Sequence, residues 1–226
     1  MVDATDRSQF LRLAAVFEGG LVFVALGLGL VFRINPFAEF RVEGTAIALG
    51  IAAALPPFLL LVVTDRFRFS ALERIKRIVL QLLGPSLIAC RWYELVAVAA
   101  LAGFGEELVF RGVLQRLFER WLDFGGSGPI AGLVASNVIF GLLHCLTPTY
   151  GVLAALMGIY FGVLLDATHP PSVVAPILAH GLYDYLAFLL LRRAARTEAI
   201  PGQPSSSPTA ETVPSETSTS LTDSAG

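Results

Sequence analysis

Long apolar runs without charges constrain the fold of this chain more than any other feature. Residues 44–64 contain no Asp, Glu, Lys or Arg, and about 20 largely apolar residues are enough for a helix to cross a bilayer. Five other stretches are nearly as apolar and about as long: 13–32, 95–114, 129–147, 149–165 and 170–191. We therefore expect an all-α, polytopic integral membrane helical bundle with about six spans.

Two segments between these runs bear on the topology. Residues 78–90 are too short for a regular span and contain Gly84-Pro85, so we expect a short half-embedded segment, with a seventh span as the alternative. Residues 65–77 hold five Lys and Arg residues. Loops of this kind stay in the cytoplasm, although the segment also fits a basic amphipathic helix on the membrane surface. With six spans, both termini are cytoplasmic.

Composition narrows the class of protein further. Charged residues make up 15% of the chain, against about 25% in soluble domains, and the net charge of −2 offers no basic surface for nucleic acid. We expect an integral protein, with the plasma membrane as its location. Its predicted parts are membrane helices with the basic loop (1–90), a core that carries the buried charges (91–191) and a disordered tail rich in Ser, Thr and Pro (192–226).

Ionisable side chains inside the predicted spans are the candidates for function. A charge at the bilayer centre costs roughly 2.5–3.5 kcal/mol on insertion scales, so such residues commonly face a polar cavity and have a role there. Apart from Glu18, near the start of the first span, they gather between positions 106 and 184: Glu106, Glu107, Arg111, His144, His180 and Asp184.

Helical spacing sorts these residues into partners. Glu107 and Arg111 are four residues apart and can form an ion pair on one helix face. Glu106 points about 100° away around the helix, so it remains an unpaired carboxylate suited to act as a general base. His180 and Asp184 are also four apart, which lets Asp184 orient the imidazole.

Together these groups predict hydrolysis within a membrane cavity. Glu106, His144 and His180 have the ligand types that hold a divalent metal such as zinc; equally, they can act without a metal, as a base and two hydrogen-bond donors. Phe140 lies one helical turn before His144 and is expected to support it by packing. Asn137, two turns before His144, fits either a supporting role at the site or helix packing.

Three motifs in this order carry a resemblance to a known family: Glu106-Glu107-Leu-Val-Phe-Arg111, Phe140-Gly-Leu-Leu-His144 and His180-Gly-Leu-Tyr-Asp184. Over about residues 92–190 the chain resembles the CAAX-protease and bacteriocin-processing (CPBP, or Abi) family of intramembrane endopeptidases. The best-known eukaryotic members remove the last three residues of prenylated CAAX proteins. Bacterial members are linked to bacteriocin processing or immunity.

The resemblance implies a role for each residue. Glu106 would activate the water with His144 at its side, His180 and Asp184 would form the oxyanion side, and the neighbouring ion pair would support them. The third motif of the family often ends in Asn, whereas Asp184 cannot donate a hydrogen bond when ionised. The resemblance is compatible with a metalloprotease and with a glutamate mechanism without metal.

A second class of function remains open. Some members of the family are scaffolds, so the alternative is a non-catalytic membrane protein or an immunity protein on the same fold. A protease needs a peptide or protein substrate at or in the membrane, and both alternatives need the lipid bilayer as their surroundings. Catalysis predicts that the chain is more sensitive to Glu106→Gln than to Glu107→Gln, whereas a scaffold tolerates Glu106→Gln.

Overall fold

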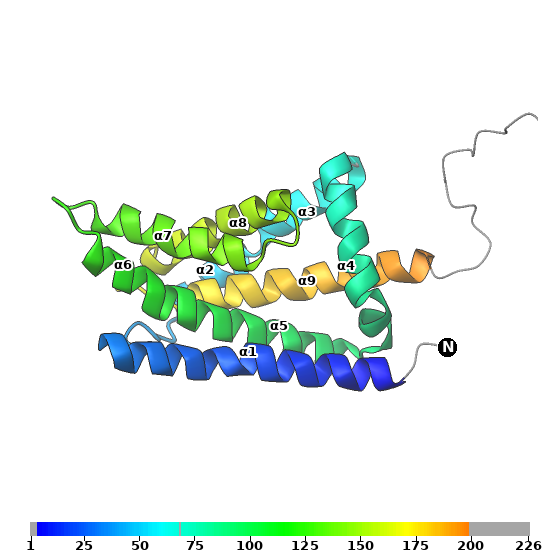
Figure 1. Ribbon diagram of the computed structural model, residues 1–226, viewed down its shortest axis with the longest axis horizontal. Helices are drawn as coiled ribbons and strands as arrows, with labels where there is room; N and C mark the ends of the chain where they lie inside the picture. The colour runs from blue at the N-terminus through cyan, green and yellow to red at the C-terminus, as the bar shows by residue number, and fades with distance from the viewer. Residues whose placement is uncertain (1–3, 68, 199–226) are drawn as a thin grey trace, which may run out of the picture.

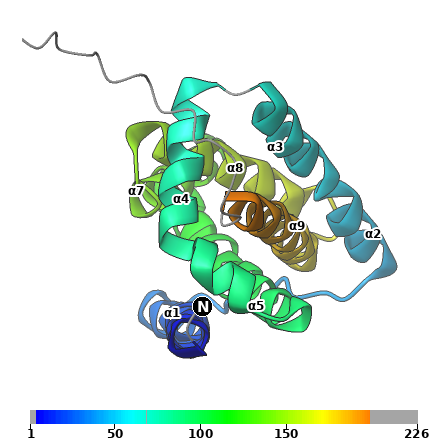
Figure 2. The same ribbon diagram turned by 90° about the vertical axis from the view of Figure 1, so that its right-hand side faces the viewer.

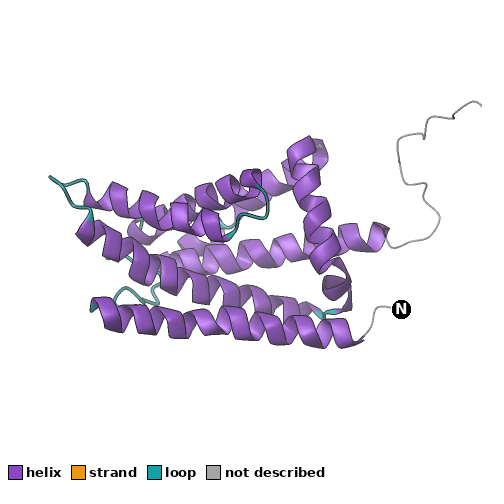
Figure 3. Cartoon of the chain, viewed as in Figure 1, coloured by secondary structure: helices purple, strands orange, loops and turns teal. Residues whose placement is uncertain are grey.

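The apolar runs of the sequence all form helices in the computed structural model, which describes residues 4–67 and 69–198. Within these ranges there is no strand (Figure 3). The elements, in chain order, are α1 (Ala4–Phe32), α2 (Gly44–Ala53), α3 (Leu55–Phe67), α4 (Ser70–Ala89), α5 (Trp92–Val109), the π-helical turn η1 (Phe110–Gln115), α6 (Arg116–Trp121), α7 (Gly128–Leu143), α8 (Pro148–Asp166) and α9 (Val174–Glu198).

The predicted all-α membrane fold is confirmed, whereas the number of spans is confirmed only in part. Four described segments are long and apolar enough to cross a membrane: Arg7–Phe32, Gly44–Phe67, Pro148–Asp166 and Val174–Glu198. The predicted span 95–114 is helical, but it includes the charges at positions 106, 107 and 111. The run 129–147 forms α7, which is apolar but only 16 residues long. Six spans therefore stay a prediction.

The second apolar run is interrupted just before two consecutive prolines. Helix α2 ends at Ala53, and α3 begins at Leu55, just before Pro56 and Pro57. Pro57 has no N–H to donate to the carbonyl of Ala53, one turn earlier. That carbonyl accepts a hydrogen bond from the Tyr160 hydroxyl of α8 instead, at 2.9 Å. The break is therefore satisfied by a neighbouring helix.

Helix α4 decides between the alternatives for this part of the chain. It runs without interruption from Ser70 to Ala89, so residues 70–77 form a helix, as the second alternative for the basic segment predicted, and the separate half-embedded segment predicted at 78–90 is wrong. Its Pro85 lies inside the helix, and the neighbouring Gly84 packs against α9, where a Cβ would meet the Ala195 Cβ at 3.4 Å, an ordinary contact distance. Packing against α9 thus keeps α4 helical through a Gly-Pro pair that favours a break.

The end of the chain corrects the predicted start of the tail. Helix α9 continues to Glu198, so residues 192–198 are helical rather than part of a disordered tail. Ala195 is buried beside α4, which explains why the helix persists beyond the apolar run. The remainder of the predicted tail, residues 199–226, lies outside the described residues, as does Arg68 of the basic segment.

Helix α9 lies at the centre of the bundle when it is viewed end-on, with the other helices arranged around it (Figure 2). Helix α5 lies between α1 and α9, and α7 packs beside α8 (Figures 1 and 2). Helices α5 and α9 approach closely at Gly103, where a Cβ would lie 2.8 Å from the backbone nitrogen of Gly181. This contact brings the ends of the first and third motifs together.

Candidate active site

The first motif occupies the end of α5 and the start of η1. Glu107 and Arg111 are fully buried and form the ion pair that their spacing predicts. Arg111 Nη1 donates to Glu107 Oε1 at 3.1 Å, and Arg111 Nε lies 3.1 Å from Glu107 Oε2. Because each charge is removed from solvent, each depends on the other for stabilisation.

Arg111 also ties this motif to α7 and α8. Its Nη2 donates to Asn137 Oδ1 at 3.1 Å and to the carbonyl oxygen of Gly158. Asn137 in turn donates from Nδ2 to the Leu133 carbonyl at 2.8 Å. Asn137 therefore lies next to the site. Gly158 does more than permit helix packing, because a Cβ there would collide with the Asn137 side chain and displace it from Arg111.

Glu107 makes a second strong contact, to the third motif on α9. His180 Nδ1 lies 2.8 Å from Glu107 Oε1, and both side chains are buried. Asp184 Oδ2 lies 3.5 Å from His180 Nε2, which is too long for a good hydrogen bond. The group that orients the His180 imidazole is thus Glu107, rather than Asp184 as the spacing suggested.

Glu106 points about 100° around α5 from Glu107 and takes no part in these hydrogen bonds. Its Oε2 is buried and has no hydrogen-bond partner among the described residues. The same oxygen is 3.8 Å from His144 Nε2 and 4.0 Å from His180 Nε2. The structure therefore brings the unpaired carboxylate and two imidazoles to one point, as predicted from the sequence.

The second motif sets the ring orientation of its histidine. His144 Nδ1 lies 2.9 Å from the Phe140 carbonyl, and because a carbonyl oxygen only accepts hydrogen bonds, Nδ1 carries the hydrogen. In the neutral ring, Nε2 is then an acceptor that faces Glu106. Phe140 supports the ring as expected, with centroids 4.3 Å apart and planes inclined by 22°.

Phe161 is a supporting residue that the sequence analysis missed. Its ring stacks on His180, with centroids 4.9 Å apart and an interplanar angle of 20°. Arg111 lies over both supporting rings, with Cζ 5.4 Å from the Phe140 centroid and 6.0 Å from that of Phe161. No motif marks Phe161, because its role depends on the contact between α8 and α9.

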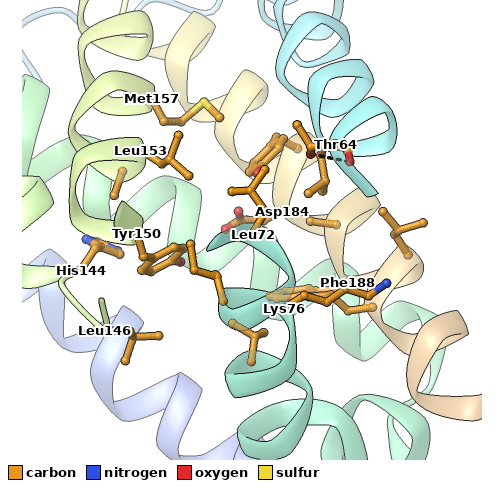
Figure 4. Close-up of a pocket in the computed structure, with 18 of the residues that line it drawn as sticks. Thr64, Leu72, Lys76, His144, Leu146, Tyr150, Leu153, Met157, Asp184 and Phe188 are labelled. Carbon is orange, nitrogen blue, oxygen red and sulfur yellow. Dashed lines mark hydrogen bonds between the residues drawn. The ribbon is translucent and has the colours of Figure 1, made fainter. Parts of the chain in front are cut away.

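A cavity of about 520 Å³ opens from these groups toward α3 and α4. Figure 4 shows His144, Tyr150 and Asp184 facing the same part of it. Its other walls are mostly apolar side chains from α3, α4, α8 and α9, such as Leu61, Leu72, Leu153, Met157 and Phe188. The site thus combines a small polar end with a long apolar wall.

The three predicted metal ligands lie near one another, but farther apart than the ligands of a bound zinc ion. No group of three or more His, Cys, Asp or Glu side chains suited to hold a metal ion occurs within residues 4–67 and 69–198. Zinc bonds of about 2.0–2.2 Å in a tetrahedral site keep ligand atoms about 3.3–3.5 Å apart, whereas Glu106 Oε2 is 3.8 and 4.0 Å from the two imidazole nitrogens. As they lie here, these side chains do not fit a zinc ion, and dependence on a metal stays a prediction.

Comparison with known proteins agrees with this geometry. Residues 88–186 match the family model described as type II CAAX prenyl endopeptidase Rce1-like. No curated protein and no solved structure gives a significant match. The matched segment includes Glu106, Arg111, His144, His180 and Asp184. Residues 88–186 therefore form a domain of the Rce1-like family of CAAX prenyl endopeptidases, as the three motifs predicted.

Proposed function

We propose that this chain is an intramembrane endopeptidase that hydrolyses a peptide bond with a water activated by Glu106. The observation that carries the proposal is the division of labour between two adjacent carboxylates. Glu107 is bonded to Arg111 and His180, whereas Glu106 Oε2 has no partner among the described residues and faces two imidazoles and the cavity. An unpaired buried carboxylate beside an open cavity suits a general base.

The proposed reaction accounts for both hydrogens of the attacking water. A water bonded to Glu106 attacks the carbonyl carbon of the scissile bond while Glu106 takes its proton. Collapse of the tetrahedral intermediate breaks the C–N bond, and Glu106 returns the proton to the leaving amine. Because His144 Nδ1 donates to the Phe140 carbonyl, its Nε2 accepts the second hydrogen of the water and orients the attack.

His180 is the residue we assign to the developing oxyanion. Its Nδ1 donates to Glu107, and its Nε2, which faces Glu106 and the cavity, carries a proton when the ring is an imidazolium. An imidazolium at this position is balanced by Glu107 and by Asp184, which lies 3.5 Å from Nε2. In this scheme Asp184 holds charge rather than donating to substrate, which fits an Asp where the family often has Asn.

The apolar wall of the cavity supports a lipid-modified substrate. Its volume of about 520 Å³ falls within the roughly 300–1,000 Å³ of ligand pockets. Leu72, Met157 and Phe188 are among the apolar side chains that line it. We propose that this wall holds the isoprenoid chain of a prenylated C-terminal peptide, while the peptide bond to be cut lies beside Glu106.

The distribution of charge supports entry from the cytoplasm. The cavity is lined in part by the end of α3 and the first half of α4, where Arg66, Arg74 and Arg77 are found. The last turns of α9 carry Arg192, Arg193 and Arg196 at the same end of the bundle (Figure 1). By the positive-inside rule, this end and both termini face the cytoplasm.

At the opposite end, one prominent arginine is offset by acidic side chains. Arg116 lies 2.7 Å from Glu119, 2.7 Å from Asp166 and 2.9 Å from Glu39. These ion pairs join α6 to the end of α8 and to the connection between α1 and α2, so Arg116 has a structural role at this end of the bundle.

A cleavage assay on the full chain in detergent tests the proposal. The peptides are a farnesylated C-terminal peptide and its unmodified twin, and the products are mapped by mass spectrometry. We expect cleavage near the C-terminus of the farnesylated peptide, no cleavage by Glu106→Gln, and normal cleavage by Glu73→Gln, which changes another glutamate on the cavity wall. Cleavage that a chelator abolishes would instead require a metal.

The scaffold alternative predicts a different pattern in the same experiments. A scaffold on this fold would cut none of the peptides and would keep its cellular role after Glu106→Gln. A cell phenotype that survives this substitution in a folded protein would contradict the proposed function.

A further inference from the structure

Two phenols face the catalytic cavity and have no role in the mechanism above. Tyr150 comes from the first turn of α8 and Tyr183 from α9, and both line the cavity. Among the described residues neither hydroxyl forms a hydrogen bond, whereas the Tyr160 hydroxyl, on another face of α8, donates to the Ala53 carbonyl at 2.9 Å. A phenol that faces a cavity without a protein partner is free to bind a ligand.

Tyr150 is held in position from the backbone upward. Thr147 caps the N-terminus of α8, and its Oγ1 accepts a hydrogen bond from the Tyr150 N–H at 3.1 Å. This fixes the residue only three positions after the turn that follows His144. The Tyr150 side chain faces the same part of the cavity as His144 and Asp184 (Figure 4).

The electrostatic surroundings distinguish the two phenols. Tyr150 interacts with the charges of both Asp184 and Glu106, whereas the interactions of Tyr183 are with Asp184 and with Tyr150. Tyr150 also faces the part of the cavity that holds His144 (Figure 4), whose Nε2 lies 3.8 Å from Glu106 Oε2, so it is the phenol that we place beside the activated water.

The polar end of the cavity is short of hydrogen-bond donors. Glu106 and Asp184 accept hydrogen bonds when ionised, and His144 Nε2 accepts because Nδ1 donates to the Phe140 carbonyl. His180 Nε2 can offer one hydrogen at most, 3.5 Å from Asp184. A tetrahedral oxyanion is typically stabilised by more than one donor aimed at the same oxygen.

We infer that the Tyr150 hydroxyl is a catalytic residue that donates a hydrogen bond to the substrate carbonyl oxygen as that oxygen becomes an oxyanion. Tyr150 keeps its proton throughout, because the proton of the water moves to Glu106 and then to the leaving amine. The phenol donates whether or not His180 is protonated, so the two donors act independently. The inference rests on the proposed hydrolysis and adds a residue to it.

The test compares Tyr150→Phe with Tyr183→Phe in the full chain in detergent, using the farnesylated peptide. We expect Tyr150→Phe to lower kcat by about 10²- to 10³-fold, the usual loss for one oxyanion donor, with little change in KM. Tyr183→Phe is the matched control, because it removes the same hydroxyl from the other cavity phenol, and it should leave kcat nearly unchanged. Rates are normalised to the folded fraction, measured by thermal unfolding.

A tetrahedral inhibitor separates catalysis from a structural role. A phosphinate peptide carries a negatively charged oxygen at the position of the oxyanion in the tetrahedral intermediate. The substitution Tyr150→Phe should therefore raise the inhibition constant of the phosphinate by the same factor by which it lowers kcat/KM. Equal weakening of substrate and phosphinate, or full kcat in Tyr150→Phe, would overturn the inference. So would a loss found in Tyr183→Phe instead.

The outcomes also separate this inference from the proposed function. Cleavage that depends on Glu106 but not on Tyr150 overturns only the role of Tyr150. A wild-type protein that is folded and cuts no peptide contradicts the hydrolysis itself, and the role of Tyr150 with it.

Discussion

Removal of the Arg111 guanidinium tests whether the buried network holds the four helices of the site together. The substitution Arg111→Met keeps a long side chain in place but leaves Glu107, which is fully buried, without its ionic partner. Breaking a buried ion pair from one side costs about 3–5 kcal/mol. Arg111→Met also removes the hydrogen bonds to Asn137 and to the Gly158 carbonyl, so the upper end of that range is expected.

The assay is thermal unfolding of the purified chain in detergent. At about 2–4 °C per kcal/mol for a chain of this size, a loss of about 5 kcal/mol in Arg111→Met should lower Tm by about 10–20 °C. Arg120→Met is the matched control, because Arg120 is exposed on α6, and such surface substitutions usually change stability by less than about 0.5 kcal/mol.

A double-mutant cycle then isolates the pair. Glu107→Gln keeps an acceptor for His180 but removes the charge, so the double variant Glu107→Gln/Arg111→Met no longer buries an unpaired carboxylate. We expect it to lose less free energy of unfolding than the sum of the two single variants, by more than about 1 kcal/mol. Additivity within about 0.5 kcal/mol, or a loss of less than 1 kcal/mol in Arg111→Met, would refute the reasoning.

Two further predictions concern positioning and pH. Gly103→Ala should lower kcat/KM by about 10²-fold, because its Cβ would lie 2.8 Å from the Gly181 nitrogen and push α9 from α5. Gly27→Ala is the control and should be neutral, because nothing lies within 4 Å of a Cβ there. Equal activities of the two variants would disprove this prediction. Near the start of α5, the hydrogen bond from Arg7 lowers the pKa of Glu94 to about 2. A carboxyl group whose pKa is lowered in the folded protein stabilises the fold at pH values above its pKa in the unfolded chain, near 4.5. The Tm difference between wild type and Arg7→Gln should therefore be constant at neutral pH and shrink as pH falls from about 4.5 toward 2.

Local spacing predicted much of the site from the sequence. The Glu107–Arg111 pair and the unpaired Glu106 follow from the geometry of one helix, since four residues make about one turn and adjacent residues diverge by about 100°. The same rule predicted that Phe140 supports His144. These relations depend only on neighbours within an element, and the structure retains them.

Contacts between different helices could not be predicted from the spacing of residues along the sequence. The partner that orients His180 is Glu107, which is 73 positions away, and it prevails over Asp184 on the same helix face because its oxygen lies 2.8 Å from Nδ1. Phe161 and the Gly158 carbonyl were missed for the same reason. Likewise, the packing of α9 on Gly84 decides that α4 continues through Pro85, against the local preference for a break.

The kinetics of Glu106→Gln beside Glu73→Gln test the central claim most directly. Both substitutions exchange a carboxylate for an amide on the wall of one cavity, but only Glu106 faces the two imidazoles. Loss of a general base typically lowers the rate by about 10²- to 10⁴-fold. The account predicts such a fall in kcat for Glu106→Gln, with KM and Tm retained, and wild-type kinetics for Glu73→Gln. A folded Glu106→Gln protein that cleaves the farnesylated peptide at the wild-type rate would contradict it.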